Sequence, residues 1–119
     1  METRKLYIGG RWIETGKTIT VVDPGNGETI AQVVSADRTV ARQAVEAAAD
    51  ALPAWRSLTG MQRADYLLAV AASLERRRDE LAKTITRENG KPLAQARGEV
   101  AVSVDHLRWF AEEARRGYG

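Results

Sequence analysis

The pattern of apolar and polar residues divides the chain into a first part that resembles strands and a longer part with a helical period. Up to residue 34, short β-branched or aromatic runs are separated by glycine, asparagine and proline, which predicts strands joined by turns. From residue 35 onward, apolar residues recur at steps of three and four, the period of one helix face. We therefore predict an α+β chain, with strands and hairpins in residues 1–34 and a helical part in residues 35–119.

Two antiparallel strand pairs are expected in the first part. Residues 6–13 predict a hairpin with Gly9 and Gly10 in its turn, because glycine adopts positive φ angles without steric cost. Residues 18–34 predict a second pair, since Asp23–Glu28 between its β-branched runs contains Pro, Asn and Gly.

Gly25-Asn26-Gly27 could also be interpreted as a phosphate-binding loop. The dinucleotide fingerprint needs three glycines between a strand and a helix, and the P-loop needs Lys-Ser/Thr after its second glycine. Here a β-branched run follows and neither pattern is met, so we predict a plain turn.

About four helices are expected in the second part, and capping signals predict where they begin and end. Side-chain oxygens suit helix starts, whereas proline and Asn-Gly suit helix ends. The expected signals, in chain order, are Ser35 or Asp37 with Pro53, the capping box from Thr59 to Gln62, Asp79 with Asn89-Gly90, and a long last helix that begins at Leu93.

Charge and hydropathy exclude several classes of protein. The formal charge is +2, from 18 basic and 16 acidic residues, and the basic run Arg76–Arg78 is interleaved with acids, so we expect a solvated helix face and no nucleic acid partner. No apolar run reaches the roughly 18 residues of a membrane span, and the first residues do not form a signal peptide. We expect no membrane partner and a cytoplasmic protein.

The residues of nucleophilic and metal chemistry are almost absent. The chain has no cysteine and a single histidine, His106, which lies in a helical stretch beside Asp105. A thiolate nucleophile, a sulfur ligand and a His pair are therefore all excluded. We assign His106 no role, name no catalytic residue, and expect no catalysis by this chain alone.

Six groups of segments stand out along the chain: residues 6–12 (LYIGGRW), 22–31 (VDPGNGETIA), 44–48 (AVEAA) with Trp55, Arg63-Ala64 with Leu67-Leu68, 87–100 (RENGKPLAQARGEV) and 109–119 (WFAEEARRGYG). In this order and at this spacing, they resemble the N-terminal segment of the aldehyde dehydrogenase family, closest to its succinate-semialdehyde dehydrogenase branch. The resemblance covers nearly all of the chain.

The resemblance implies a partial piece of the α/β aldehyde dehydrogenase fold. In that family the cofactor-binding residues and the nucleophilic cysteine come later in the sequence, so residues 1–119 are expected to supply scaffold only. The complete enzyme would use NAD or NADP, oxidise a semialdehyde such as succinate semialdehyde to its acid, and form a homo-oligomer. The expected partner of this chain is the remainder of that polypeptide, and no cofactor is expected to bind this chain alone.

The resemblance also implies two candidate sites. Many members hold a structural monovalent cation with main-chain carbonyls of the strand that corresponds to Val21-Val22 and with the acid that here is Glu88. Oxygen ligands suit such a hard cation. An ion pair with Lys91 is the alternative for Glu88, whose carboxylate lies at the negative end of a helix dipole.

The second site is the mouth of the substrate tunnel, which the family's long helix passes. Gly98 and Val102 are the positions nearest to that lining. A glycine inside a helix costs about 1 kcal/mol relative to alanine, which predicts that another element approaches Gly98 closely. A neighbouring helix would satisfy this equally well.

The competing hypothesis is a stand-alone helical interaction or dimerisation module without catalysis. Both hypotheses concern the apolar stripe of the last helix, which a partner would cover. The residues expected to remain exposed in the isolated chain are Leu93, Val100, Val104, Leu107 and Phe110.

Overall fold

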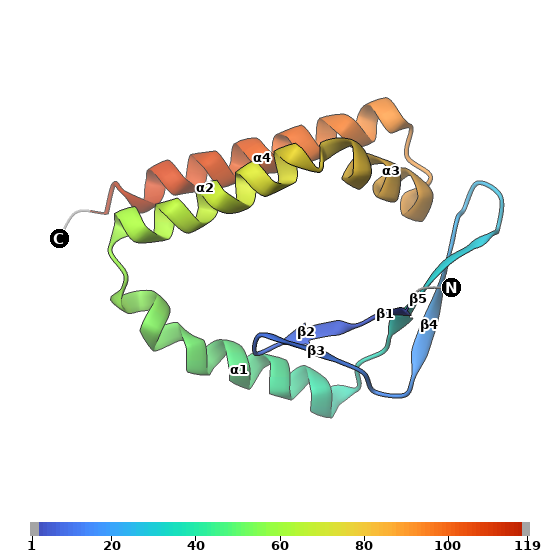
Figure 1. Cartoon of the computed structure of the whole chain (residues 1–119), viewed down its shortest axis with the longest axis horizontal. Helices are drawn as coiled ribbons and strands as arrows, with labels where there is room; N and C mark the ends of the chain where they lie inside the picture. The colour runs from blue at the N-terminus through green and yellow to red at the C-terminus, as the bar shows by residue number, and fades with distance from the viewer. Residues whose placement is uncertain (1–2, 118–119) are drawn as a thin grey trace. The chain divides into compact units, whose positions relative to one another are not determined.

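The computed structural model describes residues 3–117 and divides into two compact units, one up to Ala54 and one from Trp55. The elements in chain order are β1 (Thr3–Arg4), β2 (Leu6–Ile8), β3 (Arg11–Ile13), β4 (Thr18–Val22), β5 (Thr29–Val34), α1 (Arg38–Ser57), α2 (Gly60–Arg76), α3 (Arg78–Asn89) and α4 (Leu93–Ala114) (Figure 1). The α+β prediction is confirmed.

Both predicted hairpins are present in the first unit. β2 pairs antiparallel with β3, and the turn between them contains Gly9 at φ 58° and Gly10 at φ 80°. β4 pairs antiparallel with β5, with a bulge between Val21 and Val22. The predicted turns therefore set the pairing of both hairpins, as local turn chemistry should.

One strand pairing was not predicted. β1 pairs in parallel with β5, which gives a three-stranded sheet of order β1-β5-β4 beside the separate β2-β3 hairpin. Parallel pairing joins segments that are distant in the sequence, and no local turn signal marks it. Among residues 3–54, Val34 at the end of β5 is the buried hydrophobic residue.

Helix α1 begins where the sequence predicted but extends past its expected end. The Asp37 carboxylate accepts a hydrogen bond of 2.9 Å from the Val40 backbone N–H, which caps the first turn. Pro53 lies inside the helix, which continues to Ser57. The prediction that Pro53 ends the helix was wrong, because proline removes one backbone donor but leaves the residues after it free to stay helical.

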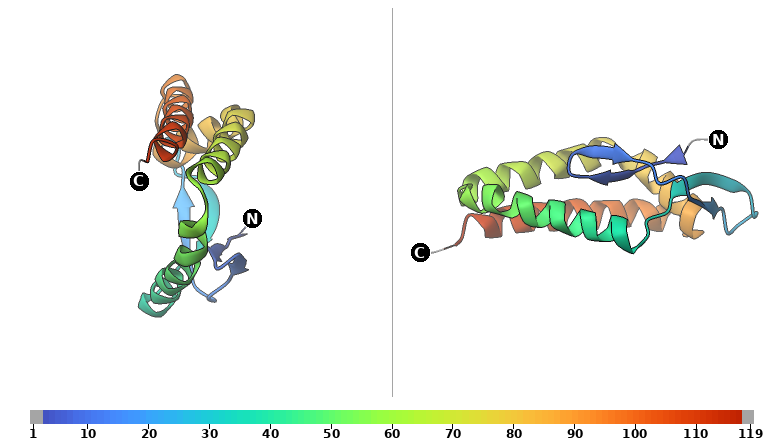
Figure 2. Two further views of the ribbon diagram at one scale, coloured as in Figure 1. Left: turned by 90° about the vertical axis from the view of Figure 1, so that its left-hand side faces the viewer. Right: turned by 90° about the horizontal axis from the view of Figure 1, so that it is seen from below.

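The second unit is built on α2 and α4, which lie side by side along their length (Figures 1 and 2). The buried positions between the helices are mostly alanines, which allow helix axes to approach closely. The core residues are Ala64 and Ala71 of α2, Ala82 of α3, and Ala96, Val100, Val104 and Ala111 of α4. At one end of the pair, a Cβ added to Gly60 would lie 2.3 Å from the Ala114 carbonyl oxygen.

The helix ends of this unit follow the sequence at three of the four predicted places, one of which is the start of α4 at Leu93. The predicted capping box is present at the start of α2. The Gln62 backbone N–H donates to the Thr59 hydroxyl at 3.2 Å, and the Thr59 backbone N–H donates to Gln62 Oε1 at 2.9 Å. Gly90 ends α3 in the left-handed conformation, at φ 77°. Asp79 does not cap α3, because the helix begins one residue earlier, after Arg77.

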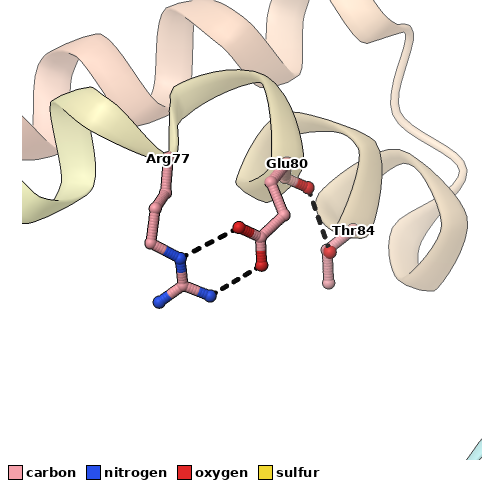
Figure 3. Close-up of polar contacts among 3 residues, drawn as sticks. All are labelled: Arg77, Glu80 and Thr84. Carbon is pink, nitrogen blue, oxygen red and sulfur yellow. Dashed lines mark hydrogen bonds and ion pairs between the residues drawn. The ribbon is translucent and has the colours of Figure 1, made fainter.

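The start of α3 is stabilised by a side-chain pair instead of a cap. The Arg77 guanidinium donates two hydrogen bonds, of 3.0 and 2.7 Å, to the Glu80 carboxylate in the first turn of α3 (Figure 3). In the next turn, the Thr84 hydroxyl donates to the Glu80 carbonyl at 3.1 Å.

The expected exposure of the α4 stripe was wrong for its central residues. Val100 and Val104 are buried, at 4% and 1% exposure, and Leu93 and Leu107 are half-buried, whereas Phe110 is exposed as predicted. The stripe faces inward because α2 and α3 of this same chain already cover it. Across residues 3–117, no helix is long and apolar enough to cross a membrane.

Candidate functional site

The corner between α3 and α4, residues 86–92, is a fixed turn. Gly90 donates its N–H to the Thr86 carbonyl at 2.8 Å, and Pro92 precedes the first residue of α4. Only glycine adopts this left-handed conformation without strain. The corner therefore sets the positions of Glu88 and Lys91 at the junction of two helices.

One ion pair joins the corner to α4, and a second joins α3 to α4. The Lys91 ammonium contacts the Glu99 carboxylate, nearly two turns into α4, and the Arg97 guanidinium donates to Asp79 of α3 at 2.9 Å. These side chains are at least about one-third exposed, so each pair contributes only a few tenths to about 1 kcal/mol. They therefore add little to the stability of the corner.

Glu88 lies in the last turn of α3 and its carboxylate is exposed. The alternative that Lys91 pairs with it was wrong: Gly90 turns the chain, so that Lys91 faces Glu99 on α4. Within residues 3–117, Glu88 has no ion-pair partner. Its carboxylate oxygens are therefore available to a cation.

Val22, the other predicted cation residue, is the last residue of β4 in the first unit. The strand register shifts between Val21 and Val22. A bulge disrupts the hydrogen-bond ladder, so backbone groups beside it are less committed to strand pairing. Val22 and Glu88 belong to different units, and their joint use by one cation stays a prediction.

The second predicted site lies on the outer face of α4, which we define as Gly98, Val102 and Trp109. Steps of four and seven residues place these three on one side of the helix, opposite the buried Val100 and Val104. Val102 is 54% exposed and Trp109 is 65% exposed. Sequence reasoning missed Trp109, although its seven-residue step from Val102 was a readable signal.

The expected close approach to Gly98 is absent within residues 3–117. An added Cβ there would meet no heavy atom within 4 Å. No helix of the described part therefore explains why a glycine stands at this position.

The outer face of α4 continues into a shallow depression at its C-terminal end. The depression is lined by Asp105, His106, Trp109 and Phe110, all of them exposed. The lining is mainly aromatic, and the depression is open to solvent. It can accept an apolar side chain, but it offers no enclosed volume for chemistry.

The basic run at the α2–α3 junction is largely neutralised by its neighbours. Arg77 pairs with Glu80 at 2.7 Å, and Arg78 lies 3.8 Å from Glu75. The hydrogen bond and the negative charge of Glu80 raise the pKa of Arg77 above its ordinary value. These pairs support the interpretation of a solvated helix face.

A divalent metal and a nicotinamide cofactor each need a recognisable set of donor groups. No group of three or more His, Cys, Asp or Glu that could hold a metal ion occurs in the described part of the chain. Gly25-Asn26-Gly27 forms the turn from β4 to β5, so that a strand and not a helix follows the glycines. These residues do not fit a pyrophosphate.

Comparison with known families and curated proteins agrees with the segments singled out above. The family model described as "Aldehyde dehydrogenase family" matches residues 12–119. The chain is 43% identical over 118 residues to glutarate-semialdehyde dehydrogenase of Pseudomonas putida, covering 98% of this chain and 25% of that protein. It is 42% identical over 113 residues to mitochondrial succinate-semialdehyde dehydrogenase of Rattus norvegicus. This match covers 95% of this chain and 22% of that protein.

Solved structures show the same relationship. An NADP dependent enzyme of E. coli superimposes with a TM-score of 0.94 at 38% identity, covering 98% of this chain and 24% of that one. Succinate-semialdehyde dehydrogenase from Burkholderia pseudomallei superimposes with a TM-score of 0.93 at 37% sequence identity. The match covers 98% of this chain and 24% of that one. The chain spans about a quarter of the length of these relatives.

Proposed function

Since the chain belongs to the aldehyde dehydrogenase family, we propose that it is the N-terminal scaffold part of an NAD(P)-dependent semialdehyde dehydrogenase. The complete enzyme would oxidise a short semialdehyde, of the succinate or glutarate semialdehyde kind, to its carboxylic acid. The similarity to glutarate- and succinate-semialdehyde dehydrogenases over nearly the whole chain supports this substrate class.

The observation that carries a scaffold role is the distribution of apolar residues in the second unit. Its buried core is made of alanines and two valines, while Trp109, Phe110 and Val102 are each more than half exposed. Small buried side chains stabilise a fold weakly, and large exposed ones mark a surface that another part covers. The remainder of the enzyme is the partner we propose for that surface.

The chain's own residues do not perform the redox chemistry. There is no cysteine to attack an aldehyde, and the glycine turn does not fit a pyrophosphate. The nicotinamide cofactor, when bound to the complete enzyme, supplies the hydride acceptor. We propose that this chain alone binds no cofactor and that its role is to position helices beside the catalytic parts.

We propose two contacts of the complete enzyme with these residues. The exposed Glu88 carboxylate and a main-chain carbonyl near Val22 would hold a structural monovalent cation, for which oxygen ligands are suited. Gly98 and Val102 would line the entrance of the substrate tunnel. The open space around Gly98 supports this, because no element of the described part occupies it.

The proposal also extends to assembly and location. We propose a cytoplasmic homo-oligomer, formed by the complete enzyme and not by this chain alone. Neither a nucleic acid nor a membrane is part of the proposal, given the paired arginines at the α2–α3 junction and the absence of a spanning helix in residues 3–117.

A chimaera tests the scaffold role. Residues 1–119 of this chain would replace the matched segment of the Pseudomonas putida glutarate-semialdehyde dehydrogenase, to which they are 43% identical. We expect a folded chimaera that oxidises glutarate semialdehyde and succinate semialdehyde. A folded chimaera without activity on either would contradict the proposed role.

Two variants of the chimaera separate its parts. Gly98→Leu should raise the KM for the aldehyde with little change in thermal stability, because the added side chain would narrow the tunnel entrance. Lys83→Ala, on the exposed surface of α3, is the control and should change neither the KM nor the thermal stability. Glu88→Gln should weaken stabilisation by K⁺ or Na⁺, measured as the dependence of the melting temperature on salt identity.

A further inference from the structure

Both asparagines of the chain, Asn26 and Asn89, are followed directly by glycine. Asparagine before glycine is the pair most open to spontaneous deamidation, because glycine has no side chain to hinder attack by its backbone nitrogen. The two sites share this local chemistry. A difference in their reactivity must therefore arise from their structural settings.

Asn26 lies in the exposed turn between β4 and β5, and Gly27 follows it at φ 75°. The Glu28 backbone N–H donates to Asn26 Oδ1 at 2.9 Å. This hydrogen bond folds the side-chain amide over the Gly27 peptide and polarises the Cγ–Oδ1 bond, which makes Cγ more electrophilic. The Asn26 side chain is thus held near its attacking nitrogen.

The Gly27 N–H itself donates to the Asp23 carbonyl at 2.8 Å. Attack on Asn26 requires this bond to open. The bond closes an exposed surface turn and packs against no buried side chain, so its opening requires little of the unit to unfold.

Asn89 is the last residue of α3, and its setting opposes the same reaction. The Cα–Cβ bond of a helical residue tilts toward the helix N-terminus, away from the following backbone nitrogen. The Gly90 N–H is also bonded to the Thr86 carbonyl at 2.8 Å, in the cap that ends the helix. Ring closure at Asn89 would break this cap and unwind the last turn.

We propose that Asn26 is a site of spontaneous modification to aspartate and isoaspartate, and that Asn89 is protected. The Gly27 backbone nitrogen loses its proton and bonds to Asn26 Cγ, while the side-chain nitrogen leaves as ammonia. Water then adds to either carbonyl of the cyclic imide, and the ring opens to aspartate or to isoaspartate. Water is the only co-reactant, and no electrons are transferred.

The modification would change the first unit in two ways. It adds a negative charge between Asp23 and Glu28, which are already acidic. Isoaspartate also inserts a methylene group into the backbone of the turn that places Val22 opposite Thr29. Both changes weaken the pairing of β4 with β5.

The test is a comparison of the two sites within one sample. The purified chain is incubated at mildly alkaline pH, and peptides that contain Asn26 or Asn89 are followed by mass spectrometry, with isoaspartate separated from aspartate by chromatography. We expect Asn26 to react about tenfold faster, which corresponds to about 1.4 kcal/mol of activation free energy. Asn26→Gln should abolish the major modified product, and Asn89→Gln should not.

A parallel incubation in concentrated urea distinguishes structure from sequence. We expect the two rates to converge there, because both sites lose their folded settings. Equal rates in buffer, a faster Asn89, or a ratio that persists unchanged in urea would each overturn the proposal.

Discussion

Val104→Ala tests which face of α4 forms the core of the second unit. Val104 is the largest fully buried side chain of residues 3–117, at 1% exposure. Alanine removes two methyl groups, at about 0.8 kcal/mol for each carbon taken from the interior. The cavity left behind raises the loss to about 2 to 3 kcal/mol. Alanine's higher helix propensity returns about 0.5 kcal/mol, so the net loss is about 2 kcal/mol.

Val102→Ala is the matched control, with the same substitution two residues away on the same helix. Val102 is 54% exposed and lies on the outer face of α4. Little apolar burial is lost there and the propensity gain remains, so we expect a change within about 0.5 kcal/mol.

Urea denaturation of the purified chain, followed by far-ultraviolet circular dichroism, measures both variants. A unit of this size is stabilised by only about 3 to 5 kcal/mol, so Val104→Ala should lower the urea midpoint markedly and reduce the helix signal even without urea. The conclusion depends only on which variant has the lower urea midpoint. It therefore holds even when the unfolding transition is broad. Equal midpoints for the two variants, or a lower one for Val102→Ala, would refute the assignment of the buried face.

Three further outcomes are expected. Gly60→Ala should destabilise the second unit by about 1 to 3 kcal/mol, because the added Cβ would lie 2.3 Å from the Ala114 carbonyl oxygen. Gly98→Ala should not destabilise it, because the space around Gly98 is open. Urea midpoints measure both variants. Isothermal titration of the chain with NAD and NADP should show no binding at micromolar levels, and saturable binding would contradict the scaffold proposal. The chain should self-associate or bind apolar dyes; sedimentation with calorimetry checks this, and a sharp transition in a defined dimer would favour the interaction module.

Local sequence signals were sufficient where one residue type controls one backbone feature. The Gly9-Gly10 turn, the capping box from Thr59 to Gln62 and the helix stop at Gly90 were all predictable, because each depends on φ preference or on a side chain within hydrogen-bond reach. The order of segments along the chain was also sufficient to recognise the family. That recognition required no contact between distant residues.

The tertiary structure alone decided which surfaces meet. β1 pairs with β5, which lies about thirty residues later in the chain, and Lys91 forms its ion pair with Glu99 instead of Glu88. Neither contact is indicated by neighbouring residues in the sequence. Periodicity showed that α4 has an apolar stripe that includes Val104, but not whether α2 and α3 or a missing partner cover it. A stripe has the same spacing whichever surface covers it, so its burial depends on the packing of the other helices. The proposed cation and tunnel residues stay predictions for the same reason: their function depends on elements that these 119 residues do not contain.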